Sequence, residues 1–234
     1  MARIAKRIKT AREAMGPARA YNIEEAVELL LSLPKAKFDE TVEVAFRLGV
    51  DPKKADQMIR GTITLPHGVG KAVRVAAFAV GEKAREAEEA GADIVGGDDL
   101  VEKVQGGFIE FEKAVATPDM MGKVGKLGKV LGPRGLMPNP KLGTVTMDIS
   151  RAIKELKAGK LEYRVDKTGI LHMAIGKASF GKQKIVENLR VLAEEILRAK
   201  PSSSKGTYLK SVFISTTMGL GIKLDTNTIK ELVT

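Results

Sequence analysis

The apolar positions of the N-terminal part change from helical spacing to strict alternation. Asn22 followed by Glu25 is a capping pattern for a helix of about three turns, which Pro34 ends. Residues 39–50 then alternate between apolar and polar side chains, as in a strand with one buried face. The apolar face of this strand would carry Val42, Val44, Phe46, Leu48 and Val50.

The middle of the chain alternates short apolar runs with helical spacing. Residues 72–80 predict a strand that is buried on both faces, and a helix over about 82–90 follows it. An apolar stretch at Ile94 and Val95 comes next. The further predicted elements are a helix near 99–104, strands near 113–117 and 143–148, and a helix near 150–158. Strands that alternate with helices indicate a parallel, doubly wound sheet.

The pattern changes again after Gly159. It predicts two strands around a turn at Asp166–Gly169, a helix over about 181–199, and a strand at 211–216. This order complements the N-terminal helix and strand. We therefore predict an α/β fold, in which an α+β composite domain of residues 1–68 plus 159–234 carries an inserted doubly wound α/β domain of residues 69–158. Two crossings would form the hinge, with Pro66, Gly68, Gly70 and Gly159.

The amino-acid composition limits the kinds of functional site that the chain can form. The chain lacks cysteine, which excludes disulfides, thiolate zinc sites and cysteine nucleophiles. His67 and His172 are the two imidazoles, and their settings in a turn and a strand favour structural roles. We expect no metal and no cofactor. No apolar run approaches the roughly 18 residues of a membrane span, and the N-terminus lacks the apolar core of a signal peptide, so we expect a cytoplasmic protein without a membrane partner.

The net charge of +10 favours a nucleic-acid partner. Nine of the ten excess charges lie in residues 1–68 and 160–234. A basic loop at 120–146 has no acidic residue, and its prolines and glycines exclude one long helix. We expect a shaped loop that either meets RNA or tRNA or shapes its domain near the hinge. Its cations, a second candidate RNA or tRNA surface, are Lys123, Lys126, Lys129, Arg134 and Lys141.

Residues Gly176–Gln183 follow a predicted strand and precede a predicted helix, as a phosphate-binding loop does. However, Gln183 stands where a serine or threonine is needed to hold Mg²⁺. We predict that the chain is not an enzyme and keep an NTP-dependent enzyme as the alternative. The start of the helix would equally suit an RNA phosphate.

Hydroxyl groups, ammonium groups and an aromatic ring occur at predicted strand ends and turns of the composite domain. Ser215–Gly219 ends a strand in hydroxyls and an apolar side chain. Lys37, Phe38 and the turn at Asp166–Gly169 add cations, a ring and further hydroxyls. Such groups suit phosphate, 2′-hydroxyl and base contacts on folded RNA.

Several blocks of the sequence resemble the L-one family of large-subunit ribosomal proteins, most closely its bacterial type. They are AKFDETVEV (36–44), DQMIRGTITLPHGVGK (56–71), GKLGKVLGPRGLMPNPKLGTVT (125–146), GKASF (176–180) and STTMG (215–219). One departure is Val165, which stands between Arg164 and Asp166 where the family usually has asparagine. The valine side chain cannot make the hydrogen bond that asparagine could make at that position.

The resemblance implies a composite domain that grips a kinked region of large-subunit (23S-type) rRNA, and an inserted Rossmann-like domain on a hinge. It implies a structural role at the mobile ribosomal stalk, help in releasing exit-site tRNA, and repression of the protein's own operon mRNA. The free protein would be monomeric. A non-ribosomal RNA-binding regulator is a third possibility. The implied RNA-binding residues are Lys37, Phe38, Thr41, Glu43, Lys167, Thr168, Gly169, Ser179, Ser211, Thr217, Met218 and Gly219.

Overall fold

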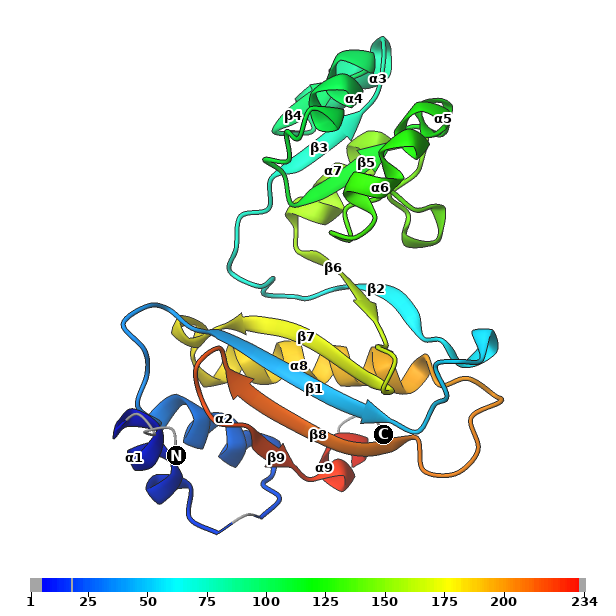
Figure 1. The fold of residues 1–234 in the computed structure, drawn as a ribbon. Helices are drawn as coiled ribbons and strands as arrows, with labels where there is room; N and C mark the ends of the chain where they lie inside the picture. The colour runs from blue at the N-terminus through cyan, green and yellow to red at the C-terminus, as the bar shows by residue number, and fades with distance from the viewer. Residues whose placement is uncertain (1–5, 18, 232–234) are drawn as a thin grey trace. The chain divides into compact units, whose positions relative to one another are not determined.

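The computed structural model describes residues 6–17 and 19–231, and it divides the chain into two compact units (Figure 1). Unit 1 consists of Met1–Gly70 and Glu162–Thr234, and unit 2 consists of Lys71–Leu161. Unit 1 is therefore assembled from both ends of the chain. Within the described residues, no helix is long and apolar enough to cross a membrane.

Unit 1 is built on a four-stranded antiparallel sheet in the order β7-β1-β8-β9. The strands are β1 (Thr41–Leu48), β7 (Ile170–Lys177), β8 (Leu209–Thr216) and β9 (Ile222–Leu224). The strands expected at 39–50 and 211–216 are confirmed as β1 and β8. The inner face of β1 is buried as the alternation predicts, whereas β9 is too short to give a sequence signal.

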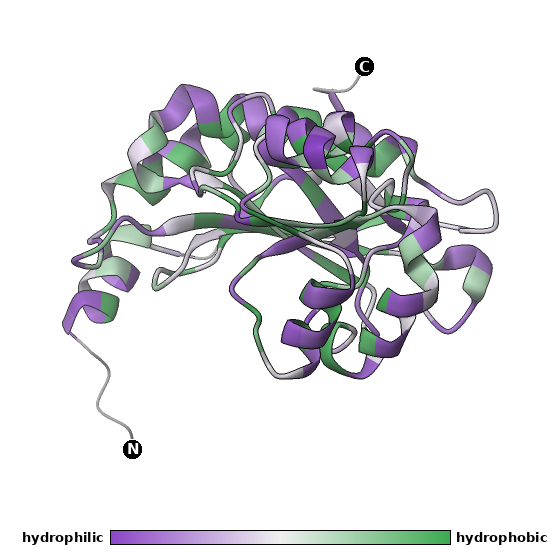
Figure 2. Cartoon of the chain, turned by 90° about the horizontal axis from the view of Figure 1, so that it is seen from above, coloured by the Kyte–Doolittle hydropathy of each residue, from purple (hydrophilic) through white to green (hydrophobic). Residues whose placement is uncertain are grey.

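Helices cover one face of this sheet. These are α2 (Ile23–Ser32) and α8 (Gly181–Arg198), while α1 (Lys6–Met15) and α9 (Thr226–Glu231) lie nearer the chain ends (Figure 1). Asn22 caps α2 as predicted, because its side-chain oxygen accepts a 2.7 Å hydrogen bond from Glu25 N. Helices of the chain carry both hydrophilic residues (purple) and hydrophobic residues (green) (Figure 2). The residues of α8 that are fully or almost fully buried are Ile185, Asn188, Leu189, Leu192, Ala193 and Ile196.

A second, two-stranded sheet pairs β2 (Arg60–Thr64) with β6 (Lys160–Arg164), and the short η1 (Ala55–Gln57) precedes it. The link after β2 is anchored to α8 by Asn188, which is 0% exposed. Its side chain accepts a 3.1 Å hydrogen bond from His67 N and donates a 3.0 Å bond to Gly68 O. This end of the link is therefore fixed to unit 1.

Unit 2 contains a parallel three-stranded sheet in the order β4-β3-β5. Its elements are β3 (Val75–Phe78), α3 (Glu82–Glu89), β4 (Ile94–Gly96), α4 (Asp98–Gln105), β5 (Lys113–Ala116) and α7 (Ile149–Lys157). Val75 and Ala77 pack with the face that α3 and α7 cover, whereas Ala76 and Phe78 pack with the face under α4. Helices on both faces of a parallel sheet confirm the doubly wound arrangement and the α/β class.

The basic segment of unit 2 is helical over part of its length, which corrects the expectation of a loop. Four short turns follow one another: η2 (Pro118–Met120), α5 (Met121–Val124), η3 (Gly125–Leu127) and α6 (Gly128–Leu131). Val124, Leu127 and Leu131 are fully buried against the α4 side of the sheet. This packing outweighs the poor helix propensity of the glycines.

One smaller expectation is also corrected. The strand predicted at 143–148 is wrong, because a single bridge between Ala116 and Val145 takes its place after η4 (Pro140–Leu142). The sequence patterns also gave no prediction for the helix α1, because its polar composition gives little helical signal.

Candidate nucleic-acid interface

Three segments that are distant in the sequence meet at one end of the unit 1 sheet. β1 begins there while β7 and β8 end there, because Thr41 pairs with Lys177 and Val42 pairs with Thr216. The loop before β1, the residues after β7 and the turn after β8 therefore lie together. This strand-end site, as we call it, comprises residues 36–41, 177–179 and 216–219.

The turn after β8 has a fixed backbone and exposed side chains. Thr217 N donates to Thr41 O, and Thr41 N donates to the Thr217 hydroxyl, both over 3.0 Å. Met218 is 52% exposed. A Cβ at Gly219 would lie 2.2 Å from Thr216 Oγ1, so any larger residue there would have to displace that hydroxyl. An exposed apolar side chain on an immobilised turn suits contact with an unstacked base or a ribose.

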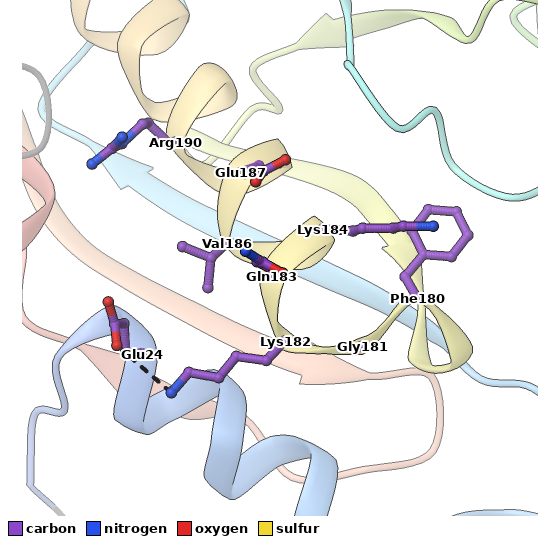
Figure 3. Close-up of a pocket in the computed structure, with 9 residues that line it drawn as sticks. All are labelled: Glu24, Phe180, Gly181, Lys182, Gln183, Lys184, Val186, Glu187 and Arg190. Atoms are coloured by element: carbon purple, nitrogen blue, oxygen red, sulfur yellow. Dashed lines mark ion pairs between the residues drawn. The ribbon is translucent and has the colours of Figure 1, made fainter.

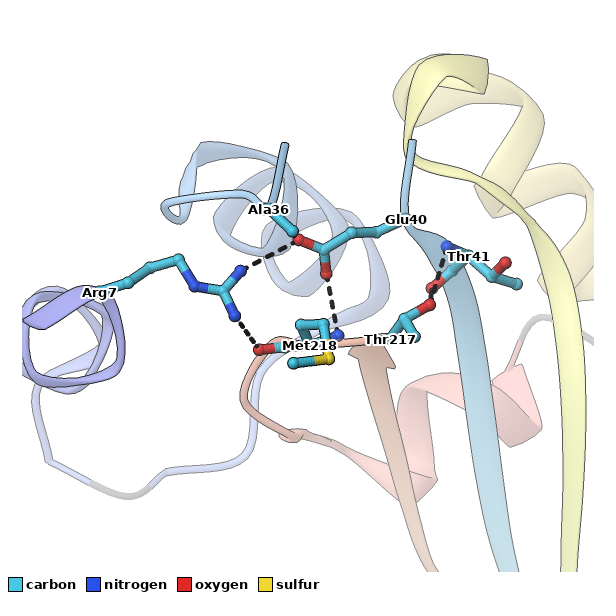
Figure 4. A network of polar contacts seen from close by, with 6 residues as sticks. All are labelled: Arg7, Ala36, Glu40, Thr41, Thr217 and Met218. Atoms are coloured by element: carbon cyan, nitrogen blue, oxygen red, sulfur yellow. Dashed lines mark hydrogen bonds and ion pairs between the residues drawn. The ribbon is translucent and has the colours of Figure 1, made fainter. Parts of the chain in front are cut away.

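Glu40 is a buried carboxylate within the strand-end site (Figure 4). It accepts hydrogen bonds from Ala36 N and, over 3.0 Å, from Met218 N, and it forms a 3.2 Å ion pair with Arg7. Burial alone would raise the pKa of Glu40. Hydrogen bonds from Thr216, Ala36 and Met218, with the charge of Arg7, outweigh burial and hold the pKa below its ordinary value. Glu40 is therefore a charged acceptor at neutral pH.

Ser179 is joined to the same loop through Asp39. The Ser179 amide and hydroxyl both donate to the Asp39 carboxylate, over 3.1 Å and 2.7 Å. Lys177 Nζ donates to Thr41 Oγ1 over 2.9 Å. In the free protein the Ser179 proton is therefore already committed, and its oxygen remains able to accept. The neighbouring loop residue Phe38 is 55% exposed.

The turn at Asp166–Gly169 lies at the opposite end of β1 from the strand-end site. Leu48 N donates to Gly169 O over 2.9 Å, and β1 is roughly 20–25 Å long at about 3.3 Å per residue. The structure therefore does not bring Lys167, Thr168 and Gly169 together with the turn after β8.

Asp166 organises this second turn. Its carboxylate accepts 2.8 Å hydrogen bonds from the amides of Ile170 and Thr168 and a 2.7 Å bond from the Thr168 hydroxyl. The bond from Ile170, followed by that from the Thr168 hydroxyl, lowers the pKa of Asp166 below its usual range. Lys167 is exposed, whereas Gly169 is buried with φ +80°. Lys167 is thus the side chain of this turn best placed for RNA.

The uncovered face of the sheet connects the two ends. Glu43 and Arg47 are exposed, and they alternate with the buried positions of β1. In the next row, Ala45 lies between His172 of β7 and Phe213 of β8. Phe213 is 40% exposed. Ser211, which pairs with Arg47, lies at the far end of the same face.

Sequence reasoning missed several of these residues. Phe213 had a usable signal, because Val212 and Ile214 on either side of it are typical inward positions of a strand. Arg7 and Glu40 had none, since they meet only through the folding of distant segments. Val165, the position at which the sequence departs from the family resemblance, is 3% exposed and belongs to the core.

The phosphate-loop alternative places Lys182 in a groove of about 730 Å³ at the start of α8 (Figure 3). Lys182 points to α2, where it pairs with Glu28 at 3.1 Å and Glu24 at 3.6 Å. The hydrogen bond to Glu28 and the charges of both acids raise the pKa of Lys182. Among the described residues, no group of acidic or histidine side chains is arranged to hold a metal ion. Lys182 is therefore paired with acidic residues of unit 1, whereas the lysine of a phosphate loop pairs with the phosphates of a nucleotide.

The second candidate surface lies in unit 2. Lys123 forms a 2.6 Å ion pair with Asp98 of α4, which offsets its charge. Four exposed cations of the segment remain, and the structure shows no bound partner for any of them within the described residues. They are Lys126, Lys129, Arg134 and Lys141.

Sequence comparison relates most of the chain to known proteins. The sequence model of the "Ribosomal protein L1p/L10e family" matches residues 30–220. A protein of Solidesulfovibrio magneticus named "Large ribosomal subunit protein uL1" is 59% identical over 213 residues, which cover 91% of each chain. A protein of Syntrophobacter fumaroxidans with the same name is 54% identical over 233 residues, which cover 100% of each chain.

Proposed function

The chain belongs to the ribosomal protein L1p/L10e family, and from this we propose that it is a structural constituent of the large ribosomal subunit. In this proposal unit 1 binds the large-subunit rRNA at the mobile stalk, through the strand-end site and the uncovered face of the sheet. The protein is non-catalytic and acts in the cytoplasm as part of the ribosome.

The observation that carries the proposal is the convergence of Phe38, Thr217 and Met218 at the strand-end site. Phe38 and Met218 are each more than half exposed, although both residues are apolar. Large apolar side chains beside hydroxyls and cations are costly to leave in water and suit the stacked bases and 2′-hydroxyls of folded RNA. Lys37 supplies a cation for the phosphates of the same RNA region.

The primary test uses an isolated fragment of the large-subunit rRNA and the Thr217→Val variant. We expect at least a tenfold loss of affinity in filter binding, because valine leaves both an RNA hydroxyl and the Thr41 amide without a partner, and each unsatisfied polar group costs about 1–3 kcal/mol. Thr217→Ser keeps the hydroxyl and should restore most of the affinity. Thr64→Val, on an exposed position of β2, controls for the loss of a surface hydroxyl. Unchanged affinity of Thr217→Val would remove this turn from the interface.

Substitutions of the unit 2 cations test whether the two units bind different RNA molecules. We propose that unit 2 meets the exit-site tRNA and that rRNA is held by unit 1. Single alanine substitutions of Lys126, Lys129, Arg134 or Lys141 should therefore leave the affinity for the rRNA fragment within about twofold. The release rate of deacylated tRNA from ribosomes carrying these variants should fall. A large loss of rRNA affinity would contradict this assignment.

The protein also represses translation of its own operon in this proposal, because an mRNA element of the same shape would enter the same site. Thr217→Val should relieve repression of a reporter that carries the operon leader, and Thr64→Val should not. Co-sedimentation with large subunits at high salt distinguishes a ribosomal protein from a free regulator. Magnesium-dependent ATP or GTP turnover that Lys182→Ala abolishes would instead establish the alternative enzyme.

A further inference from the structure

Glu40 joins the two segments that carry the exposed apolar side chains of the strand-end site. Within the loop it accepts a hydrogen bond from Ala36 N, which closes the loop that presents Phe38. Across the site it accepts a 3.0 Å bond from Met218 N. These two segments are separated by more than 170 residues, so the carboxylate fixes a spacing that the chain itself does not impose.

Arg7 completes the same arrangement from α1 (Figure 4). Its Nη1 atom lies 3.2 Å from the Glu40 carboxylate, and its Nη2 atom donates a 2.8 Å hydrogen bond to Met218 O. The amide and the carbonyl of Met218 are therefore both held, one by Glu40 and the other by Arg7. The Met218 side chain is left exposed, although its backbone is held on both sides.

We propose that Arg7 and Glu40 are positioning residues, which hold the Ala36–Glu40 loop and the Thr216–Gly219 turn in the spacing that RNA recognises. This inference rests on the proposed function of the strand-end site. It makes α1 a necessary part of the interface, although α1 lies outside the segments that present side chains to RNA. A preformed turn binds without the entropy cost of ordering it, and that difference appears as affinity.

A direct phosphate contact by Arg7 is the competing explanation, and it makes a different electrostatic prediction. Both terminal nitrogens of Arg7 have partners within the protein, and its charge is compensated by Glu40. A positioning residue releases no counterion when RNA binds, so its loss lowers affinity equally at low and high salt. The loss of one phosphate contact reduces the slope of log K against log salt by about one.

The experiment measures binding of Arg7→Ala, Arg7→Lys and Arg12→Ala to the rRNA fragment over a range of salt concentrations. Arg12 is an exposed residue of the same helix, so it matches the change in net charge. We expect Arg7→Ala to bind about five- to tenfold more weakly with an unchanged salt slope, and Arg12→Ala to stay within about twofold. Arg7→Lys keeps the charge but cannot reach both partners with a planar fork, and should recover only part of the affinity.

Amide hydrogen exchange of Met218 without RNA supplies a readout that is independent of binding. The exchange of this amide should accelerate about tenfold in Arg7→Ala. If the alanine variant folds poorly, the same measurement is made on Arg7→Lys, in which the exchange should also accelerate. Unchanged exchange, unchanged RNA affinity or a slope reduced by about one would each overturn the positioning role. If wild-type protein fails to bind the rRNA fragment, the proposed function fails, whereas the exchange measurement still reports on the positioning.

Discussion

Replacing Glu40 by glutamine tests whether the buried carboxylate holds unit 1 together. Glutamine has nearly the same shape, but its side chain has one acceptor oxygen and one donor group. One of the two main-chain donors, Ala36 N or Met218 N, would then face an amide NH₂ instead of an oxygen. The ion pair with Arg7 is lost as well.

The magnitude follows from these partners. An unsatisfied buried donor costs about 1–3 kcal/mol, and a hydrogen bond to a charged group is worth about 1.5–3 kcal/mol. Arg7 is 26% exposed and regains water, so the full cost of breaking a buried ion pair does not apply. We therefore expect Glu40→Gln to lower the free energy of unfolding of unit 1 by about 2–4 kcal/mol at neutral pH. Glu43→Gln, an exposed neighbour on β1, should change it by less than about 0.5 kcal/mol.

Urea unfolding followed by tyrosine fluorescence isolates unit 1. The chain has three tyrosines and no tryptophan, and Tyr21, Tyr163 and Tyr208 all belong to unit 1. The signal therefore reports on this unit even if unit 2 unfolds separately. The difference between wild type and Glu40→Gln would be compared at neutral pH and in acid.

The pH dependence has a defined sign. The pKa of Glu40 in the folded protein lies below the ordinary value of 4.5, so its contribution is complete above that value and is lost as pH falls through the folded pKa. The stability gap between wild type and Glu40→Gln should therefore narrow below about pH 4.5. A gap under about 1 kcal/mol at neutral pH, or one that stays constant in acid, would refute the reasoning.

Three further substitutions test neighbouring features. Gly219→Ala should weaken binding to the rRNA fragment about tenfold, because its Cβ would lie 2.2 Å from the Thr216 hydroxyl, which is hydrogen-bonded to Glu40. The control in the same assays is Gly122→Ala, whose Cβ would meet open space. Phe213→Ala should weaken binding at least fivefold if a base stacks there, since stacking is worth about 1–3 kcal/mol, and its unfolding curve should hardly move. Asn188→Ala removes three hydrogen bonds from a fully buried amide and should destabilise unit 1 by about 2–4 kcal/mol by tyrosine fluorescence.

Local sequence patterns predict those elements whose structure depends on local periodicity. The alternation around Phe46 identifies the buried face of β1, and Asn22 marks the start of α2. The α/β class follows from the order of such elements. The helical turns at 121–131 are different, because glycines disfavour a helix there and the burial of Leu127 and Leu131 decides the outcome. That burial depends on the position of α4, which no local pattern contains.

Some residues of the candidate site can likewise be predicted from local sequence, whereas others depend on the whole fold. Residues such as Phe38 and Met218 are recognisable because an apolar side chain in a polar turn is out of place. The register that brings Thr41 beside Lys177, and Val42 beside Thr216, depends on pairing across the whole fold. The role of Glu40 therefore could not be predicted from the sequence, because nothing in the sequence distinguishes it from the acidic residue beside it, Asp39. The positions of individual RNA contacts stay predictions.

The distribution of charge explains how this interface can be selective. The chain as a whole carries a charge of +10, but at the strand-end site the Glu40 carboxylate is paired with Arg7 of α1, and Lys177 is hydrogen-bonded to Thr41. Lys37 is thus the cation of that site most available to a phosphate. Binding that depended on net charge would favour any RNA and would weaken steeply with salt. Binding through a prepositioned turn and an exposed sheet face instead depends on RNA shape, so a modest salt slope should accompany strong discrimination between folded and unfolded RNA.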